Sequence, residues 1–271
     1  MDVIDSQNLI GIVRQPAKIK RLSMPIVLLH GWGCDSRIWQ PLLPLLRDWA
    51  DVITVDIRYA ETAVDALVDA IVAGLPEHFI LCGWSLGGML ATRVAVNFSD
   101  RVFGLITLST NLSFVEKPFW RSALASATFE QFYTLFDNNP DKGLQRFLLL
   151  EVHGDQSARQ QLQWLQQLQR ESALDPQCLL SGLQLLAEID NTHNVPQIVC
   201  PALYVFGEHD ALVPVKVVTV IEAKLNQHQQ CLILTDKGHV LHYPLNAIEC
   251  YLNAFLAKLS VIDDPTLRLP Q

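Results

Sequence analysis

The sequence lacks any apolar run of the ~18 residues that a membrane-spanning helix needs, so we expect no membrane association. Positive charge is scarce, with 20 Lys and Arg against 28 Asp and Glu, and the net charge of −8 argues against nucleic-acid binding. The first 15 residues carry Asp2 and Asp5 and no long apolar segment. We therefore expect no secretory signal and a cytoplasmic protein.

Cysteine is also infrequent and irregularly spaced. No two cysteines form a Cys-x-x-Cys pair or another spacing typical of a metal site, which favours free thiols in a reducing cytosol over disulfides. The six are Cys34, Cys82, Cys178, Cys200, Cys231 and Cys250. We expect no bound metal.

Apolar residues make up half of the 271 positions, and their order predicts alternating strands and helices. Short, nearly continuous apolar runs predict strands at 25–29, 52–56, 79–82, 102–109, 202–206 and 231–234. Amphipathic patterns predict helices at 36–50, 62–74, 86–97, 214–225 and 245–259. This alternation is typical of a mainly parallel α/β sheet flanked by helices.

The rhythm changes between residues 112 and 195, here called the lid segment. It shows helical patterns at 119–135, 142–152, 157–172 and 177–186, and no convincing strand. We expect a core of residues 1–111 and 196–262, a helical insertion at 112–195 and a polar tail at 263–271. Such an insertion would lie over the carboxyl ends of the strands, where folds of this class place their sites.

One motif suggests a nucleophile. Residues 83–87 read Gly-Trp-Ser-Leu-Gly and lie between an apolar strand and a helix, which is the context of a nucleophile elbow. Glycines on both sides of Ser85 would let neighbouring backbone pass closely. The alternative is an ordinary serine cap at the start of a helix.

A serine nucleophile needs a base and an acid that orients it, in the chain order serine, acid, histidine for this fold class. His239 follows the strand predicted at 231–234, and His242 is the weaker candidate. Asp210 follows the strand at 202–206, with Glu208 as the fallback and Asp236 as a minor rival.

Acyl transfer also needs two backbone N–H groups for the oxyanion. The N–H of Leu86, directly after the serine, is one candidate. The sequence Leu-Leu-His-Gly-Trp-Gly at 28–33 would supply the other, because its glycines allow a turn that aims the Trp32 N–H inward.

At this point the chain resembles the α/β-hydrolase superfamily. The stretches LQRFLLLEVHGDQSARQ, LLSGLQLLAEID, FGEHDALVPVKVV and DKGHVLHYP narrow the resemblance to the pimeloyl-carrier-protein methyl ester esterases of biotin synthesis. The resemblance implies an α/β-hydrolase fold with a Ser85, Asp210 and His239 triad. It implies hydrolysis of a pimeloyl methyl ester on acyl carrier protein without a metal or organic cofactor, by a protein that we expect to be a monomer.

The resemblance also assigns residues to the lid segment. Lys142 and Arg159 fall where the family carries carrier-docking arginines, with Arg146 nearby, although all three could equally be solvated helix charges. We expect Phe147, with Trp32, to contact the acyl chain; Phe147 and Trp164 would pack over this chain or within the lid.

Two departures from the family keep alternatives open. The loop after residue 56 is short and lacks the usual glycines, and the lid segment holds six Lys and Arg against ten Asp and Glu. A general short-chain esterase without a carrier-protein partner is therefore the second reading. A non-catalytic binding protein is the third, and the complete order of triad residues argues against it.

Overall fold

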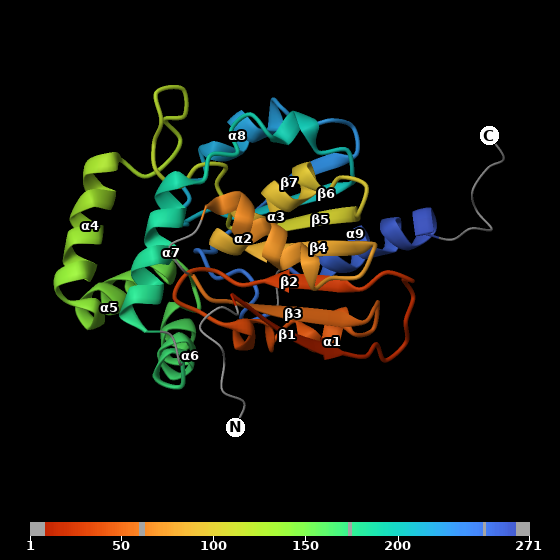
Figure 1. Cartoon of the computed structure of the whole chain (residues 1–271), viewed down its shortest axis with the longest axis horizontal. Coiled ribbons are helices and arrows are strands. Elements are labelled where there is room, and N and C mark those ends of the chain that lie inside the picture. Colours follow the sequence, from red (N-terminus) through yellow and green to blue (C-terminus); the bar gives the residue numbers. More distant parts are fainter. Residues whose placement is uncertain (1–8, 60–62, 173–174, 246–247, 264–271) are drawn as a thin grey trace.

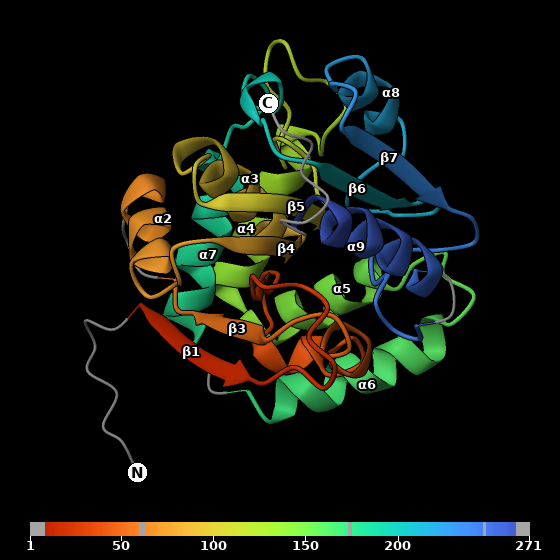
Figure 2. The ribbon, with the colours of Figure 1, turned by 90° about the vertical axis from the view of Figure 1, so that its right-hand side faces the viewer.

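The computed structural model describes residues 9–59, 63–172, 175–245 and 248–263. Its centre is a seven-stranded sheet in the order β1-β3-β2-β4-β5-β6-β7 (Figures 1 and 2). The strands are β1 (Ile10–Gln15), β2 (Ile26–Leu29), β3 (Val52–Ile57), β4 (Phe79–Trp84), β5 (Val102–Leu108), β6 (Ala202–Gly207) and β7 (Gln229–Leu234). All neighbouring strands are parallel except β1, which runs antiparallel to β3 at one edge. This confirms the predicted fold class.

The central strands β2 to β6 are buried on both faces, and their alternate side chains point to opposite sides of the sheet. In β2, Val27 and Leu29 belong to one apolar cluster, whereas Ile26 and Leu28 belong to the other. The first cluster is completed by α2 (Val64–Ala73), α3 (Leu86–Asn97) and α8 (Val217–Glu222), and the second by α1 (Leu43–Leu46) and α9 (Glu249–Asp263). Helices therefore cover each face.

Four helices gather beyond one end of the sheet, at the left of Figure 1. They are α4 (Ser126–Asn138), α5 (Pro140–Glu151), α6 (Ala158–Arg170) and α7 (Pro176–Glu188). Strands β2, β4 and β6 end on this side, so the helices lie at the carboxyl ends of the parallel strands. Within the described residues, no helix is both long and apolar enough to cross a membrane.

The predicted elements needed three corrections. Strand β1 was not predicted; it is a half-exposed edge strand whose alternation is short. The helix predicted at 36–50 is wrong: a 3-10 turn (Ser36–Trp39) precedes the short α1, because Pro41 and Pro44 lack the N–H groups that a continuous helix needs. The helix predicted at 119–135 begins at Ser126, since Lys117 and Trp120 pair in a tight turn.

The other boundaries differ by a few residues. The predicted 214–225 helix is the shorter α8, and the predicted 245–259 helix is α9, which ends at Asp263. The remaining short segment Val195–Gln197 is a single 3-10 turn after the lid segment. Most of the predicted tail lies outside the described residues.

Candidate active site

Ser85 occupies the tight turn between β4 and α3. Its backbone has φ 54° and ψ −120°, a region that non-glycine residues rarely adopt. Glycines on both sides of Ser85 make this turn possible, because neighbouring backbone approaches them too closely for a side chain. A Cβ on Gly83 would meet the carbonyl of Gly87, and one on Gly87 would meet the carbonyl of Leu29. The Ser85 side chain makes no capping hydrogen bond to α3, so the role of ordinary helix cap does not account for it.

Asp210 and His239 are brought together from the ends of β6 and β7. The Nδ1 atom of His239 lies 2.7 Å from Oδ2 of Asp210, and both side chains are fully buried. The other oxygen of Asp210 accepts the N–H groups of Leu212 and Val213 at 2.8 and 2.9 Å, which fixes the carboxylate. Nδ1 therefore carries the ring proton and donates a hydrogen bond to the Asp210 carboxylate. Nε2 has no hydrogen-bond partner among the described residues.

The rival acids and base lie elsewhere. His242 is fully buried 5.1 Å from the rings of both Trp39 and Trp84, and burial, then His239, lowers its pKa to about 3. Glu208 and Asp236 are exposed. Neither ring nitrogen of His242 has a hydrogen-bond partner among the described residues, and Glu208 and Asp236 lie beside His209, at 3.9 and 3.8 Å from its Nε2.

Glu208 and Asp236 form a group with His209 whose three ligand atoms lie within 4.8 Å of one another. It is the only such group of possible metal ligands within the described part of the chain. All three side chains are exposed, and exposed acidic groups commonly gather without an ion. The group therefore gives no reason to assign a metal centre.

The two candidate oxyanion donors flank Ser85. The N–H groups of Trp32 and Leu86 donate to no acceptor among the described residues, so both remain available. The loop that carries Trp32 approaches the serine closely, since a Cβ on Gly31 would lie 2.8 Å from the Trp84 ring and 3.2 Å from Cβ of Ser85.

Trp32 and Phe147, the two residues predicted to contact the acyl chain, pack against each other. Their rings lie 4.7 Å apart at 77°, and both are almost fully buried. The Trp32 indole N–H donates to the Leu179 carbonyl of α7 at 2.7 Å. The Trp164 ring packs on the Tyr243 ring at 4.4 Å.

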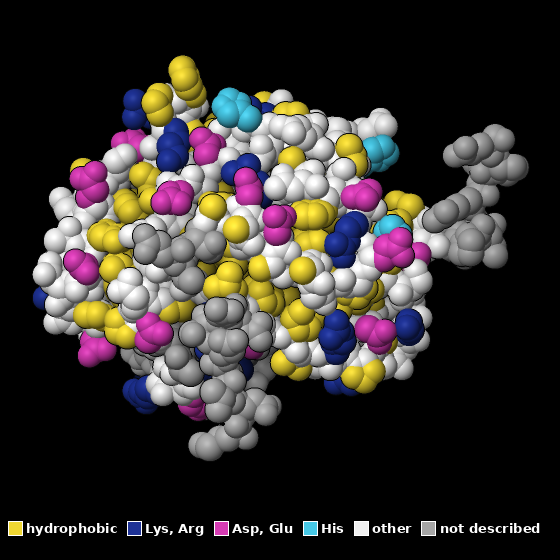
Figure 3. All heavy atoms as spheres, in the orientation of Figure 1, with side chains coloured by type: hydrophobic (Ala, Val, Ile, Leu, Met, Phe, Trp, Pro, Cys, Tyr) yellow, Lys and Arg dark blue, Asp and Glu magenta, His cyan; other side chains and the backbone are white. Residues whose placement is uncertain are grey.

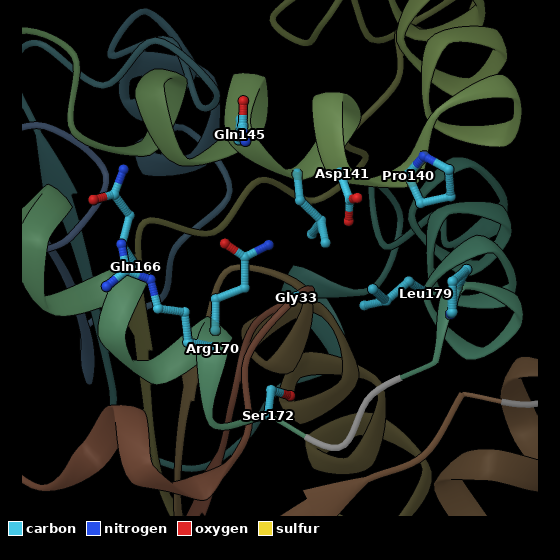
Figure 4. A pocket seen from close by; sticks show the side chains of 11 residues that line it. Gly33, Pro140, Asp141, Gln145, Gln166, Arg170, Ser172 and Leu179 are labelled. Atoms are coloured by element: carbon cyan, nitrogen blue, oxygen red, sulfur yellow. The ribbon is translucent and has the colours of Figure 1, made fainter.

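A cavity of about 480 Å³ lies between α5, α6 and the start of α7 (Figure 4). Its lining is mixed: Gly33, Pro140, Asp141, Leu144, Gln145, Gln166, Gln169, Arg170, Ser172, Pro176 and Leu179. Ser85, Asp210 and His239 do not line it. The cavity nevertheless adjoins the loop at residues 28–33 that carries Trp32, here called the oxyanion loop. Gly33 lines the cavity and directly follows Trp32, and Leu179 lines it and accepts the Trp32 indole N–H at its carbonyl.

Three residues near the triad were not identified from the sequence. Glu151, at the end of α5, is 1% exposed, its backbone carbonyl accepts the N–H of His239 at 3.1 Å, and its Oε2 has no partner among the described residues. Burial, and secondarily the charge of Asp210, raises the Glu151 pKa well above its usual range. His30 and Tyr59 are the other two, and both contact the oxyanion loop. Only the position of His30, directly before Gly31, offered a signal.

The basic residues expected to dock a carrier protein are all exposed. Lys142 and Arg146 lie on α5 and Arg159 lies on α6. On the face shown in Figure 3, acidic side chains are scattered over the lid end, and the described residues form no basic patch there.

Comparison with known proteins identifies the family. Residues 26–246 match the model of the alpha/beta hydrolase family. The chain belongs to this family. The fold also matches solved structures: a thermophilic esterase from Thermogutta terrifontis aligns with a TM-score of 0.74 at 19% identity, covering 93% of this chain and 94% of that one. A hydrolase from Oleispira antarctica aligns with a TM-score of 0.77 at 18% identity, over 92% and 95% of the two chains.

Among sequence relatives, the pimeloyl-[acyl-carrier protein] methyl ester esterase of Aliivibrio salmonicida is 33% identical over 222 residues, covering 79% of this chain and 84% of the relative. The biotin biosynthesis bifunctional protein BioHC of Cellvibrio japonicus is 36% identical over 225 residues, or 80% of this chain. The chain spans less than half of that bifunctional protein, 44% of its length. The resemblance to the methyl ester esterases is confirmed, and this hydrolase is one of their type.

Proposed function

We propose that the protein is a serine carboxylesterase in which Ser85, Asp210 and His239 form the catalytic triad. The observation that carries the proposal is the buried His239–Asp210 pair, in which Nδ1 makes a hydrogen bond of 2.7 Å and Nε2 has no partner among the described residues. The elbow conformation of Ser85 supports the role of nucleophile.

In this mechanism, Ser85 Oγ attacks the ester carbonyl while His239 Nε2 takes the hydroxyl proton. The N–H groups of Trp32 and Leu86 stabilise the oxyanion of the tetrahedral intermediate. Collapse of the intermediate breaks the C–O bond to the alkoxide, which leaves as the alcohol after taking the proton from His239. Water then attacks the acyl-serine carbonyl while His239 takes one of its protons. The second tetrahedral intermediate breaks the bond between the acyl carbon and Ser85 Oγ, His239 gives the proton to Oγ, and the free acid is released.

The triad is tested with Ser85→Ala and a serine-directed fluorophosphonate probe. We expect the folded wild type to react with the probe and to hydrolyse a p-nitrophenyl ester, and the variant to do neither. Folded wild-type protein that is not labelled would favour a non-catalytic binding protein. Activity that survives in Ser85→Ala would exclude Ser85 as the nucleophile.

We further propose that the substrate is the methyl ester of a pimeloyl chain on acyl carrier protein, and that methanol is the alcohol released. The names of the relatives support this substrate. We propose that the lid segment covers the core, residues 1–111 and 196–262, and that the cavity beside Gly33 receives the arm that joins the acyl chain to its carrier. The enzyme would act as a cytoplasmic monomer without a cofactor.

Lys142, Arg146 and Arg159 are proposed to contact the acidic carrier protein. In the double charge reversal Lys142→Glu and Arg159→Glu, we expect kcat/KM for the carrier-bound ester to fall by about 10-fold or more, since rim charges act on association. Hydrolysis of a free short ester should not change. Lys258→Glu, an exposed reversal on α9, is the matched control.

A general short-chain esterase without a carrier is the second candidate, and the acidic lid segment favours it. It predicts that the double reversal leaves both substrates unaffected. Genetic complementation separates the two candidates in the cell. A strain that lacks its own pimeloyl methyl ester esterase should regain biotin synthesis with the wild type and not with Ser85→Ala, and failure of soluble, active wild type would refute the pathway assignment.

A further inference from the structure

The peptide unit between Gly31 and Trp32 is held from its carbonyl side. The Gly31 oxygen lies 2.8 Å from Nδ1 of His30 and accepts the hydroxyl of Tyr59 at 3.4 Å. Nε2 of His30 accepts the backbone N–H of Ile57 at 2.9 Å, so the proton of the neutral ring is on Nδ1, which donates to Gly31. Burial lowers the pKa of His30, which keeps the ring neutral.

These contacts fix the proposed oxyanion donor. The C=O and N–H of a planar trans peptide point in opposite directions, so the atoms that hold the Gly31 carbonyl also set the direction of the Trp32 N–H. This N–H donates to no acceptor among the described residues. The bonds from Ile57 to His30 and from His30 to Gly31 therefore form a short chain that ends at the oxyanion hole.

Helix α7 of the lid segment rests on the same residues. The Trp32 indole donates to the Leu179 carbonyl at 2.7 Å. One turn later, a Cβ on Gly182 would lie 2.7 Å from the Trp32 ring and 2.8 Å from the Tyr59 ring, so only glycine permits this approach. The helix thus contacts the oxyanion loop directly through Trp32 and indirectly through Tyr59.

Tyr59 comes from the short segment after β3 that lacks the glycines usual in the family. It is 2% exposed and packs edge-on against the His30 ring at 6.2 Å. The departure in sequence therefore places an aromatic residue between the lid segment and the oxyanion loop.

We propose that α7 is a positioning element of the oxyanion hole: its seating on Trp32 and Tyr59 sets the Gly31–Trp32 peptide, so the hole is complete only when the lid is closed. The proposal rests on the proposed function, because it takes the Trp32 N–H as an oxyanion donor. Tyr59 and Gly182 are positioning residues that touch no reacting atom. Movement of α7 away from the core would switch off the chemical step as well as expose the site.

The decisive variant is Gly182→Ala, which inserts one methyl group between the Trp32 and Tyr59 rings. Complete loss of one oxyanion donor lowers kcat by ~10²–10³. We expect displacement of the donor to lower kcat for a p-nitrophenyl ester by about 10- to 100-fold, with KM changed less than about 3-fold. Ser181→Ala on the same helix is the matched control and should keep wild-type kinetics, since within the described part of the chain the Ser181 hydroxyl donates only to the Gln177 carbonyl.

A second variant keeps the proposal testable if Gly182→Ala does not fold. Tyr59→Phe removes only the hydroxyl, and we expect a fall in kcat of about 2- to 10-fold, the usual range for one weak hydrogen bond. The affinity for an alkyl boronic acid, which forms a tetrahedral adduct with the serine, distinguishes loss of the oxyanion donor from a general structural defect. This affinity should fall in proportion to kcat, whereas the affinity for the product carboxylate stays within about 3-fold.

The outcomes separate this proposal from the proposed function. Unchanged kcat in both folded variants would overturn the role of α7, as would a fall in kcat that leaves boronic acid affinity intact. If Ser85→Ala retains activity, the proposed function itself fails. If Ser85 is required while Gly182→Ala behaves as wild type, only the coupling of the lid to the oxyanion hole is refuted.

Discussion

Glu151 should reduce the stability of the folded protein increasingly as the pH rises. Its carboxyl group is buried, Oε2 has no hydrogen-bond partner among the described residues, and Asp210 adds a second negative charge nearby. Burial and this charge raise the pKa of Glu151 well above 4.5, so the group is protonated in the folded protein over a range where the unfolded chain has already lost its proton. The perturbation that reveals this is Glu151→Gln, which keeps the shape and cannot ionise.

Proton linkage gives the sign and size of the pH dependence of the free energy of unfolding. Below pH 4.5 the group is protonated in both states, and its neutral form is fully compatible with folding. Between 4.5 and the raised pKa of the folded state, unfolding releases one proton, so the free energy of unfolding falls by ~1.4 kcal/mol per pH unit. Glu151→Gln should lack this slope. Its advantage over the wild type should therefore grow by the same amount per pH unit across that window.

Urea unfolding at pH 5, 6 and 7 measures the effect, with the free energy of unfolding extrapolated to water at each pH. In thermal melts the same growth corresponds to roughly 2–3 °C per pH unit. Glu188→Gln, an exposed residue at the end of α7, is the control and should run parallel to the wild type. A difference between Glu151→Gln and wild type that stays constant with pH would refute the reasoning.

Two further changes test the active-site geometry. Asp210→Asn should lower kcat by about 10⁴-fold while ester binding persists, because the amide no longer holds the required His239 tautomer; steady-state kinetics against a small ester would show it, and a loss under 10-fold would exclude Asp210 as the orienting acid. Gly87→Ala places a methyl group against the Leu29 carbonyl and should cost roughly 1–3 kcal/mol of stability. In denaturant titrations Gly11→Ala, whose methyl would have ordinary contacts of 3.4 Å or more, should differ little from wild type.

Much of the fold could be predicted because a strand that is buried on both faces appears in the sequence as a continuous apolar run. Strands β2 to β7 and helices α2, α3 and α5 to α7 appear near their predicted positions. The unpredicted β1 shows the limit of this signal: it borders only β3, and most of its residues are half-buried or exposed. Its pairing depends on contacts that are distant in the sequence.

The residues of the candidate site also differ in whether the sequence predicts them. Ser85 and Asp210 each follow a fully buried strand, and His239 follows the half-exposed edge strand β7. Chain order and parallel topology were therefore enough to predict that all three lie at one end of the sheet. Glu151 and Tyr59 had no comparable signal, because their roles depend on where α5 and the segment after β3 pack in three dimensions. Residues that hold catalytic groups from a distance are set by tertiary contacts, and no local motif marks them.

His242 places a second pH-dependent penalty beside the triad, of opposite sign to that of Glu151. Its pKa of about 3 in the folded protein, against 6.5 for an ordinary histidine, arises from burial and from His239. Between these values unfolding takes up a proton, so stability rises with pH by ~1.4 kcal/mol per unit. Above pH 4.5 the Glu151 slope has the opposite sign, and where the two windows overlap the contributions cancel.

Urea unfolding across the overlap, from pH 5 to 6, should therefore separate the two groups. Relative to the wild type, Glu151→Gln should gain stability as the pH rises, and His242→Leu, which lacks a titratable ring, should gain stability as it falls. The double variant should recover a slope close to that of the wild type at a higher stability. A double variant that keeps the slope of either single variant would contradict opposite proton linkage as the source of both effects.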